Sequence, residues 1–263
     1  MKASPIGDCS EGPHGSIGDW DVSGVIEMGE IFAHASAFNQ DVSKWDVSRV
    51  TDMSSMFSFA SAFNQDLSKW DVSSVINMGF MFFRASSFNQ DVSKWNVSAV
   101  VDMRSMFSHA STFNQDLSKW DVSAARRRRF SQPPTMRSMF SYASAFNQDL
   151  SKWDVSTITD MASMFTGVSA FNQDLSKWDV SAVTDMAYMF SYATSFNQDL
   201  SNWDVSAVTN MRYMFYDAKA FRRELCGAAW MTSKADIMEM FGNSPGSISS
   251  TACTTARKGH GES

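Results

Sequence analysis

The chain has 263 residues, of which 44% are hydrophobic, and this is enough apolar side chain for a sizeable buried core. Its formal net charge of −6 gives no overall attraction to nucleic acid or to anionic membranes, so neither is expected as a partner. No apolar run approaches the roughly 20 residues that cross a bilayer, so no membrane insertion is expected.

Residues 1–16 contain Gly, Ser and Pro, and they predict a loose lead-in to the first regular unit. Their first ten residues, MKASPIGDCS, lack the apolar segment of a secretory signal. Neither a signal peptide nor an anchor is visible, and the sequence alone leaves the location unknown.

From residue 17 to residue 225 the sequence repeats, and Trp residues mark a period of 25. They fall into two series: Trp20, Trp45, Trp70, Trp95 and Trp120, then Trp153, Trp178 and Trp203. A period of this length indicates a solenoid. The string FNQDLSKWDVS recurs unchanged from residues 63, 113, 146 and 171. Such literal copying indicates architecture, because a catalytic site gains nothing from copies.

One unit, read from Leu67, is LSKWDVSSVINMGFMFFRASSFNQD. Its apolar residues alternate around Trp70 and Val72, which predicts a short strand. Later apolar residues are spaced by three and four, which predicts a short helix: Met78, Met81, Phe82, Ala85 and Phe88. Neither element buries its apolar face alone. We therefore expect an α/β repeat protein of about eight stacked turns, each with one short strand and one short helix.

Stacking places each residue above its counterpart in the preceding turn, about 4.8 Å away, so identical residues form ladders. We expect the Trp column in the core, with Met thioethers packed at the ring edges. Side-chain amides both donate and accept, so an Asn ladder can satisfy the backbone of a tight bend. That ladder comprises Asn39, Asn64, Asn89, Asn114, Asn147, Asn172 and Asn197.

The string L-x-x-W-D-V-S-x-V-T-D-M-x-x-M-F-x-x-A-x-x-F-N-Q-D resembles the repeat of the BspA-like leucine-rich-repeat family over residues 17–225. Leu67, Trp70 and Val72 stand where that family has its apolar strand positions. The resemblance implies a right-handed, non-enzymatic solenoid that serves adhesion or protein binding at a cell surface. The family defines no catalytic residue and no fixed ligand, so none is carried over to this chain.

An insertion interrupts the period near residues 124–135, where Trp120 and Trp153 are 33 residues apart. Its Arg126–Arg129 run and two Pro residues predict a solvated loop. A nuclear-localisation or nucleic-acid role and a misread gene segment are the alternatives. Residues 226–245 predict a distorted final turn that caps the core, and residues 246–263 predict a disordered tail.

Three cysteines, Cys9, Cys226 and Cys253, are too few and too far apart for a zinc site. Cys226 and Cys253 flank the final turn, and a disulfide between them can pin the tail across its open face. Two unpaired thiols are the alternative reading.

Strand alternation predicts an outward face of charged residues that can bind a partner, an unknown protein or a surface glycan. The lysine row is Lys44, Lys69, Lys94, Lys119, Lys152 and Lys177, and the aspartate row is Asp46, Asp71, Asp121, Asp154, Asp179 and Asp204. Opposite charges in neighbouring rows can instead neutralise each other as a solvated surface. A further column is read as helix N-caps, with calcium binding as the alternative: Asp52, Asp102, Asp160 and Asp185.

The positions that differ between units are not needed for the fold, and several of them are aromatic. Phe80, Tyr188 and Tyr213 are the candidate partner contacts among them, because exposed aromatic residues are favoured at protein interfaces. The other variable positions are Ser55, Ser105, Ser163, Phe59, Arg84, His109, Tyr142 and Tyr192. Scattered surface aromatics without a function are the alternative.

A flat regular face can also bind ice or a mineral surface. Its candidate column mixes Thr with aliphatic residues: Thr51, Ile76, Val101, Thr159, Thr184 and Thr209. No catalytic, metal or cofactor constellation is found, since the four His residues fall in unrelated phases and no phosphate-binding Gly loop is present. The predicted function is therefore a non-enzymatic interaction scaffold, and ice or mineral binding is the alternative.

Overall fold

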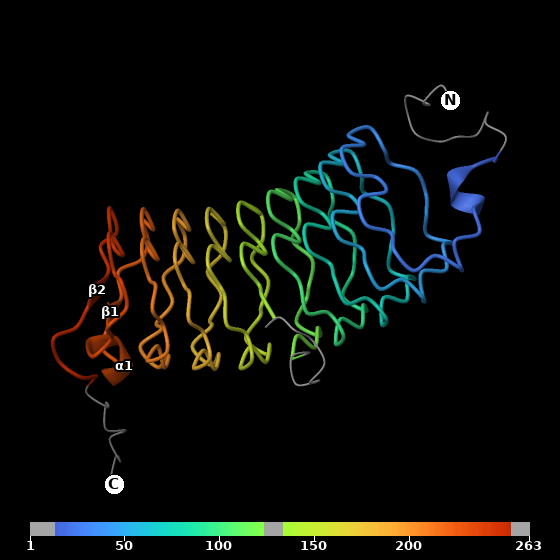
Figure 1. Ribbon diagram of the computed structural model, residues 1–263. Helices are drawn as coiled ribbons and strands as arrows, with labels where there is room; N and C mark the ends of the chain where they lie inside the picture. Colours follow the sequence, from blue (N-terminus) through green and yellow to red (C-terminus); the bar gives the residue numbers. More distant parts are fainter. Residues whose placement is uncertain (1–13, 124–133, 254–263) are drawn as a thin grey trace, which may run out of the picture.

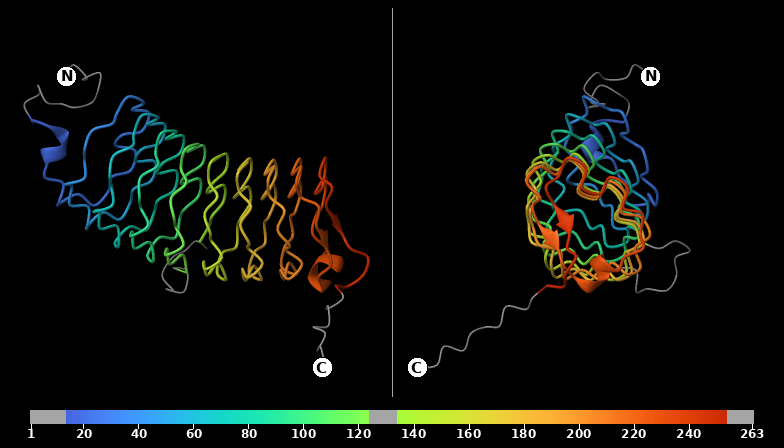
Figure 2. Two further views of the ribbon diagram at one scale, coloured as in Figure 1. Left: turned by 180° about the vertical axis from the view of Figure 1, so that it is seen from behind. Right: turned by 90° about the vertical axis from the view of Figure 1, so that its left-hand side faces the viewer.

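The computed structural model describes residues 14–123 and 134–253, which form one row of stacked coils (Figure 1). The right-hand view of Figure 2 shows the coils end-on: those of the C-terminal half nearly superimpose, and the N-terminal coils, in blue, are displaced from them. Parallel bridges one residue long join each coil to the next across these residues. We number the coils 1 to 9 by their bridge residues: Glu27, Asp52, Asn77, Asp102, Thr135, Asp160, Asp185, Asn210 and Asp236. A stack of repeats is thus present, as predicted, while its right-handedness stays a prediction.

Regular secondary structure is sparse in the described residues. It comprises the 3-10 helix η1 (Ile17–Asp19), the strand β1 (Glu224–Leu225), the helix α1 (Ala228–Met231) and the strand β2 (Ser247–Ile248). The prediction of one strand and one helix in every repeat is therefore wrong. The segment around Trp70 forms a tight turn, in which the Trp70 N–H donates to the Leu67 carbonyl at 3.1 Å. The bridge lies further along, at Asn77.

Residues 78–85, where a helix was expected, form consecutive turns because alternate N–H groups bond to the next coil. The N–H of Met78 donates to the Asp102 carbonyl at 2.9 Å, and that of Phe80 donates to the Arg104 carbonyl at 2.8 Å. The N–H of Met81, between these bonds, returns three residues to the Met78 carbonyl. An α-helix needs every N–H to bond four residues back. The three-four spacing of apolar residues therefore reflects paired turns and not helical turns.

The core consists of columns of identical side chains that run the length of the stack. The buried Trp95 donates its indole N–H to the Leu67 carbonyl of the preceding coil at 3.0 Å. Its ring lies 6.5 Å from that of Trp120, within 8° of parallel. Phe82 lies 5.6 Å from both Phe57 and Phe107 in a second column. Each coil thus covers the apolar face of its neighbour, as a solenoid requires.

The asparagine column supplies hydrogen-bond acceptors at the bend that joins successive coils. The Oδ1 of Asn39 accepts the Asn64 N–H at 2.8 Å and the Gln65 amide at 3.1 Å, and this pattern is repeated along the stack. At the last coil two arginines take over the donor roles: the Arg222 N–H bonds to Asn197 Oδ1 and the Arg223 Nε–H bonds to the Asn197 carbonyl. A guanidinium cannot accept hydrogen bonds, so the ladder ends here.

The C-terminal cap extends further than predicted. The strand β2 pairs in parallel with β1, Ile248 beside Leu225, and Cys226 is bonded to Cys253 as a disulfide with a Cα–Cα distance of 5.0 Å. Residues 246–253 therefore belong to the cap, which corrects their assignment to a disordered tail, and the bridge expected across the final turn is present. Residues 1–13 and 254–263 and the Arg126–Arg129 run lie outside the described residues. No helix in the described part is long and apolar enough to cross a membrane.

Candidate binding face

Each coil carries two backbone positions in the left-handed conformation, four residues apart, on its outer turns. In coil 3 they are Phe80 and Arg84, both with φ of 58°. The first position is Glu30, Ser55, Phe80, Ser105, Ser138, Ser163, Tyr188, Tyr213 and Glu239. The second position is His34, Phe59, Arg84, His109, Tyr142, Gly167, Tyr192, Asp217 and Asn243. We call the surface formed by these two columns the binding face.

Left-handed φ values disfavour side chains, yet Gly167 is the one glycine in these two columns. A non-glycine residue in this conformation costs about 1–2 kcal/mol, and bulky residues are rare in it. Strain of this kind is concentrated at functional sites. The positions that vary between repeats are therefore positions at which glycine would give the least backbone strain.

The side chains of the second column stack on one another along the solenoid. The His34 and Phe59 rings lie 4.5 Å apart within 15° of parallel, and the Arg84 guanidinium carbon lies 5.4 Å from the Phe59 centroid. His109 and Tyr142 stack in the same way at 4.8 Å. Burial and the nearby Arg84 charge lower the pKa of His109, which favours its neutral form.

The Tyr142 ring extends the column across the next coil. A Cβ atom at Gly167 would lie 2.5 Å from its Cδ1 atom, so glycine leaves the space that this ring occupies. Tyr142 is nevertheless 45% exposed. His109 covers one face of the ring, and much of the Tyr142 side chain remains open to solvent.

All five tyrosines of the chain lie on or directly beside this face, in coils 5, 7 and 8. The Tyr188 and Tyr213 rings stack 4.9 Å apart, and Tyr216 meets Tyr213 at 5.5 Å and Tyr192 at 5.7 Å, edge to face. Tyr188 and Tyr192 are 43% and 44% exposed. Desolvation by these neighbours, followed by the nearby Tyr216 and Asp217, raises the pKa of Tyr192, so its hydroxyl stays protonated.

The sequence located this face in part. Phe80, Tyr188 and Tyr213 were chosen as partner contacts, and all three lie at the first left-handed position. Two aromatic residues that complete the face, Phe83 and Tyr216, were missed. Each follows the buried Met-Phe pair directly, and the doubled aromatics of MFF and MFY are the signal that marks them.

The predicted lysine and aspartate rows are exposed on a different part of each coil, but their expected pairing is not what the structure shows. Asp46 accepts hydrogen bonds from the backbone and hydroxyl of Ser48 at 3.1 and 2.6 Å, and Asp71 accepts the Ser73 N–H at 3.0 Å. These serine bonds lower the pKa of both aspartates. The exposed row members are Lys44, Lys69, Lys94, Lys119, Lys152 and Lys177, with Asp46, Asp71, Asp121, Asp154, Asp179 and Asp204.

The lysine charges act on another acidic column, that of the repeated Asn-Gln-Asp string. Asp91 has a lowered pKa, caused first by its bonds to Ser93 and then, after an opposing desolvation effect, by Lys94 and Lys119. Asp66 and Asp149 show the same dependence on nearby lysines. The aspartates that were predicted to pair with the lysines thus accept hydrogen bonds from serines two residues further along the chain. Partner binding by either row stays a prediction.

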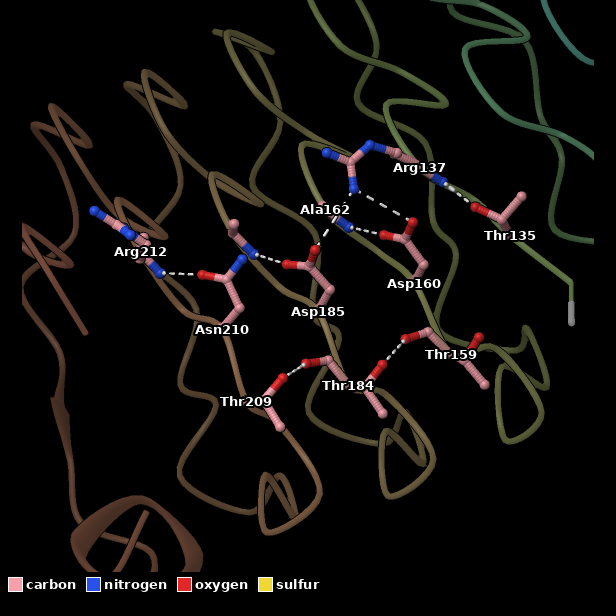
Figure 3. Close-up of polar contacts among 11 residues, drawn as sticks. Thr135, Arg137, Thr159, Asp160, Ala162, Thr184, Asp185, Thr209, Asn210 and Arg212 are labelled. Atoms are coloured by element: carbon pink, nitrogen blue, oxygen red, sulfur yellow. Dashed lines mark hydrogen bonds and ion pairs between the residues drawn. The ribbon is translucent and has the colours of Figure 1, made fainter. Parts of the chain in front are cut away.

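A polar strip that carries the bridge residues lies beside the binding face (Figure 3). Asp160 Oδ1 accepts the Ala162 N–H at 2.9 Å, and the Arg137 guanidinium reaches Asp160 and Asp185 at 3.4 and 3.5 Å. No helix follows these aspartates, so they close turns and are not helix N-caps. No group of three or more potential metal ligands is found in residues 14–123 and 134–253.

The threonine column runs parallel to this strip (Figure 3). Thr184 Oγ1 donates to the Thr159 carbonyl and Thr209 Oγ1 donates to the Thr184 carbonyl, each at 3.1 Å. Ile76 and Val101 interrupt the column in coils 3 and 4. The hydroxyl protons of these threonines are therefore used within the protein and do not face an external lattice.

Comparison with known proteins gives one family. The family described as "Mycoplasma protein of unknown function, DUF285" matches residues 10–78, 45–131 and 134–251. Among solved structures, a similar chain occurs in the "Crystal structure of TLR13-ssRNA13 complex", with 13% sequence identity and a TM-score of 0.30. That match covers 76% of this chain and 30% of the other. Comparison with curated proteins gives no match. Because these three matches, of which the first two overlap, together cover most of its length, the chain belongs to the DUF285 family.

Proposed function

We propose that this protein is a non-enzymatic scaffold that binds a protein partner through the binding face. The observation that carries the proposal is the placement of large, exposed aromatic side chains at left-handed backbone positions along that face. The stack itself does not need them, since Gly167 fills one such position in coil 6. A surface retained at a cost in stability is expected to have a role beyond folding.

The composition of the face supports a protein partner. Tyr and Ser dominate the two columns in coils 4 to 8, with one His, one Gly and one Asp among them, and Arg84 lies in coil 3. Tyrosine gives large contact area at low cost in side-chain entropy, and serine gives adaptable hydrogen bonds, which is the chemistry of protein-recognition surfaces. Tyrosine and arginine are also the residues on which binding energy is concentrated.

The orientation of the rings distinguishes a protein from a glycan. Sugars bind best against open aromatic faces, but one face of each of the His109, Tyr142, Tyr188 and Tyr213 rings is stacked on a ring of the neighbouring coil. Less open ring face is therefore left for a sugar, whereas ring edges and hydroxyl groups suit a protein partner. The resemblance to BspA-like repeats supports the same class of function, and a place at the cell surface is part of this proposal.

The experiment compares wild type with two matched variants in capture from cell extracts and from surface-exposed protein fractions. The first is Tyr188→Ser with Tyr192→Ser, which keeps the hydrogen-bonding character of the face and removes its aromatic area. The second is Lys94→Ala with Lys119→Ala on the lysine row. We expect a partner that wild type and the lysine variant retain and the tyrosine variant loses.

Loss with the lysine variant alone would overturn the choice of face and favour the charged rows. Binding to a panel of immobilised glycans without any protein partner would overturn the choice of partner. The ice-binding alternative has its own measurement, thermal hysteresis, and the inward hydroxyl bonds of the threonine column give no support to it.

A further inference from the structure

The hydrogen bonds between coils on the binding face have one direction, which makes the two ends of the stack different. Backbone N–H groups of each coil donate to carbonyls of the following coil: Tyr213 to Met238 at 2.9 Å, and Asp217 to Gly242 at 2.7 Å. Coil 1 follows the same rule, with Glu30 donating to the Ser54 carbonyl. On the binding face, the coil 9 end of the stack therefore presents donors and the coil 1 end presents acceptors.

Within residues 14–123 and 134–253, both sets of terminal groups lack backbone partners. At the end of coil 9 the donors are the N–H groups of Ile237, Glu239, Phe241 and Asn243. At the start of coil 1 the acceptors are the carbonyls of Glu27, Gly29, Ile31 and Ala33. The two sets share spacing and register, because each belongs to the same segment of its coil. Such unpaired edges are templates for pairing with another chain.

Apolar side chains accompany these edges at both ends. Ile26 and Ile31 are 50% and 47% exposed on coil 1, and Ile237 and Met238 are 50% and 47% exposed on coil 9. The Phe241 ring ends the phenylalanine column, stacked 5.5 Å from Phe215. A following coil would extend that column by one ring of the same kind, which Phe32 of coil 1 can supply.

Residues 244–253, which we call the strap, occupy part of the place of a following coil. The Ser249 N–H donates to the Leu225 carbonyl at 2.9 Å. In the preceding coil the equivalent carbonyl, that of Leu200, accepts the indole N–H of Trp230 instead. Ile248 lies beside Leu225, where the first apolar residue of the next coil belongs. The Cys226–Cys253 disulfide holds the strap in this position.

The start of coil 1 has the matching groups. Ile17 is its first apolar residue, since its carbonyl accepts the Trp45 indole N–H at 2.9 Å. The Trp20 indole has no preceding coil and donates to the His14 carbonyl at 3.1 Å. In a second copy stacked on coil 9, Ile17 would therefore take the position of Ile248. The Trp20 indole N–H would bond to the Leu225 carbonyl. Strap and incoming coil cannot occupy this place together.

We infer that the exposed end of coil 9 is an interface for a second copy of this chain, whose coil 1 stacks on it as a tenth coil once the strap is released. An external dithiol or phosphine reductant releases the strap: it supplies two electrons, is itself oxidised, and converts the Cys226–Cys253 disulfide into two thiols. The register places Glu30 opposite Glu239 and Glu27 opposite Asp236, so like charges oppose the contact. Salt therefore strengthens the association, because it screens these charges.

Sedimentation velocity of the intact chain, with and without a phosphine reductant, tests the inference. We expect a monomer at all concentrations under non-reducing conditions and a mass that rises with concentration after reduction. A variant without cysteines, Cys9→Ser with Cys226→Ser and Cys253→Ser, should associate without reductant. The reductant also prevents intermolecular disulfides at Cys9, so a larger species then reflects stacking.

Two end variants make the test specific. Ile31→Lys blocks the acceptor end and Ile237→Lys blocks the donor end, so each reduced variant alone should remain monomeric. A mixture of the two has one intact end of each kind and should form a dimer that grows no further. A reduced wild type that stays monomeric with native circular dichroism would overturn the inference, as would association that the lysine variants leave unchanged. Loss of the native spectrum on reduction would also overturn it, because the strap would then be needed for folding.

Discussion

The inner columns and the binding face are built from the same repeats, yet they differ in how freely their residues vary. Trp70 and its counterparts are copied in coil after coil, and so is the Asn-Gln pair that bonds one bend to the next. At the second left-handed position, His, Phe, Arg, Tyr, Gly, Asp and Asn all occur. Stacking fixes the first group because each side chain must fit its copy in the neighbouring coil.

This difference identifies the positions whose side chains can be substituted without loss of the fold. Side chains on the binding face leave the surface of the coil, so residues of very different size and polarity occur at the same position in successive coils. The backbone there is held by bonds to the next coil, such as Phe59 to the Phe83 carbonyl at 2.7 Å, whichever side chain is present. The strain of the left-handed positions is thus carried by the stack, which leaves the side chain available for recognition.

Removal of one inner side chain should give the largest effect. Trp95→Ala leaves a void and removes one of the two hydrogen bonds that the Leu67 carbonyl accepts, and we expect a loss of about 3–5 kcal/mol in the free energy of unfolding. Urea denaturation followed by circular dichroism measures it. The matched control is the exposed neighbour Lys94→Ala, with a change of about 0–1 kcal/mol. Equal losses from the two substitutions would contradict the assignment of inside and outside.

These assignments of inside and outside could be made from the sequence because they depend on the repeat period alone. Residues such as Trp95 and Phe82 recur every 25 positions, and a stack is the arrangement that buries them all. The local backbone could not be predicted in this way. Apolar spacing of three and four has the same appearance in a helix and in paired turns, and bonds to a coil 24 residues away decide between them.

The binding face was predicted from variability, but its geometry was not. Phe80 and Tyr188 were expected to point outward from a helix, and they point outward from left-handed turns. No sequence signal marks these turns, because Gly appears in one coil and the other coils use residues that rarely adopt this conformation. The serine bonds of Asp46 and Asp71 were also not foreseen, because strand alternation was assumed there.

A smaller effect is expected at the glycine of the binding face. Gly167→Ala adds a Cβ atom at φ of +67° and against the Tyr142 ring, so we expect a loss of about 1–2 kcal/mol and displacement of that ring. The control is Ser163→Gly at the other left-handed position of the same coil, where relief of strain and the entropy of glycine offset each other. Denaturant midpoints measure both variants. Equal destabilisation by the two would show that the left-handed backbone is not the cause.

The smallest effect concerns the aspartates that close turns beside the tryptophan column. Bonds from the Ser73 hydroxyl and N–H hold the pKa of Asp71 below its ordinary value of about 3.9. A carboxyl with a lowered pKa stabilises the folded state above pH 4, and this contribution is lost as the pH falls through the folded-state value. Asp71→Ala should therefore lower Tm at pH 7 on the order of 1 °C, and the difference from wild type should shrink at about pH 2.

Coil 4 supplies the control, because its Asn96 occupies the same place and accepts the Ser98 N–H at 3.2 Å. Asp71→Asn should thus keep the turn and lose the charge, with a Tm closer to wild type than that of the alanine variant at pH 7. A Tm difference between Asp71→Ala and wild type that is independent of pH would show that the carboxylate charge does not strengthen this turn.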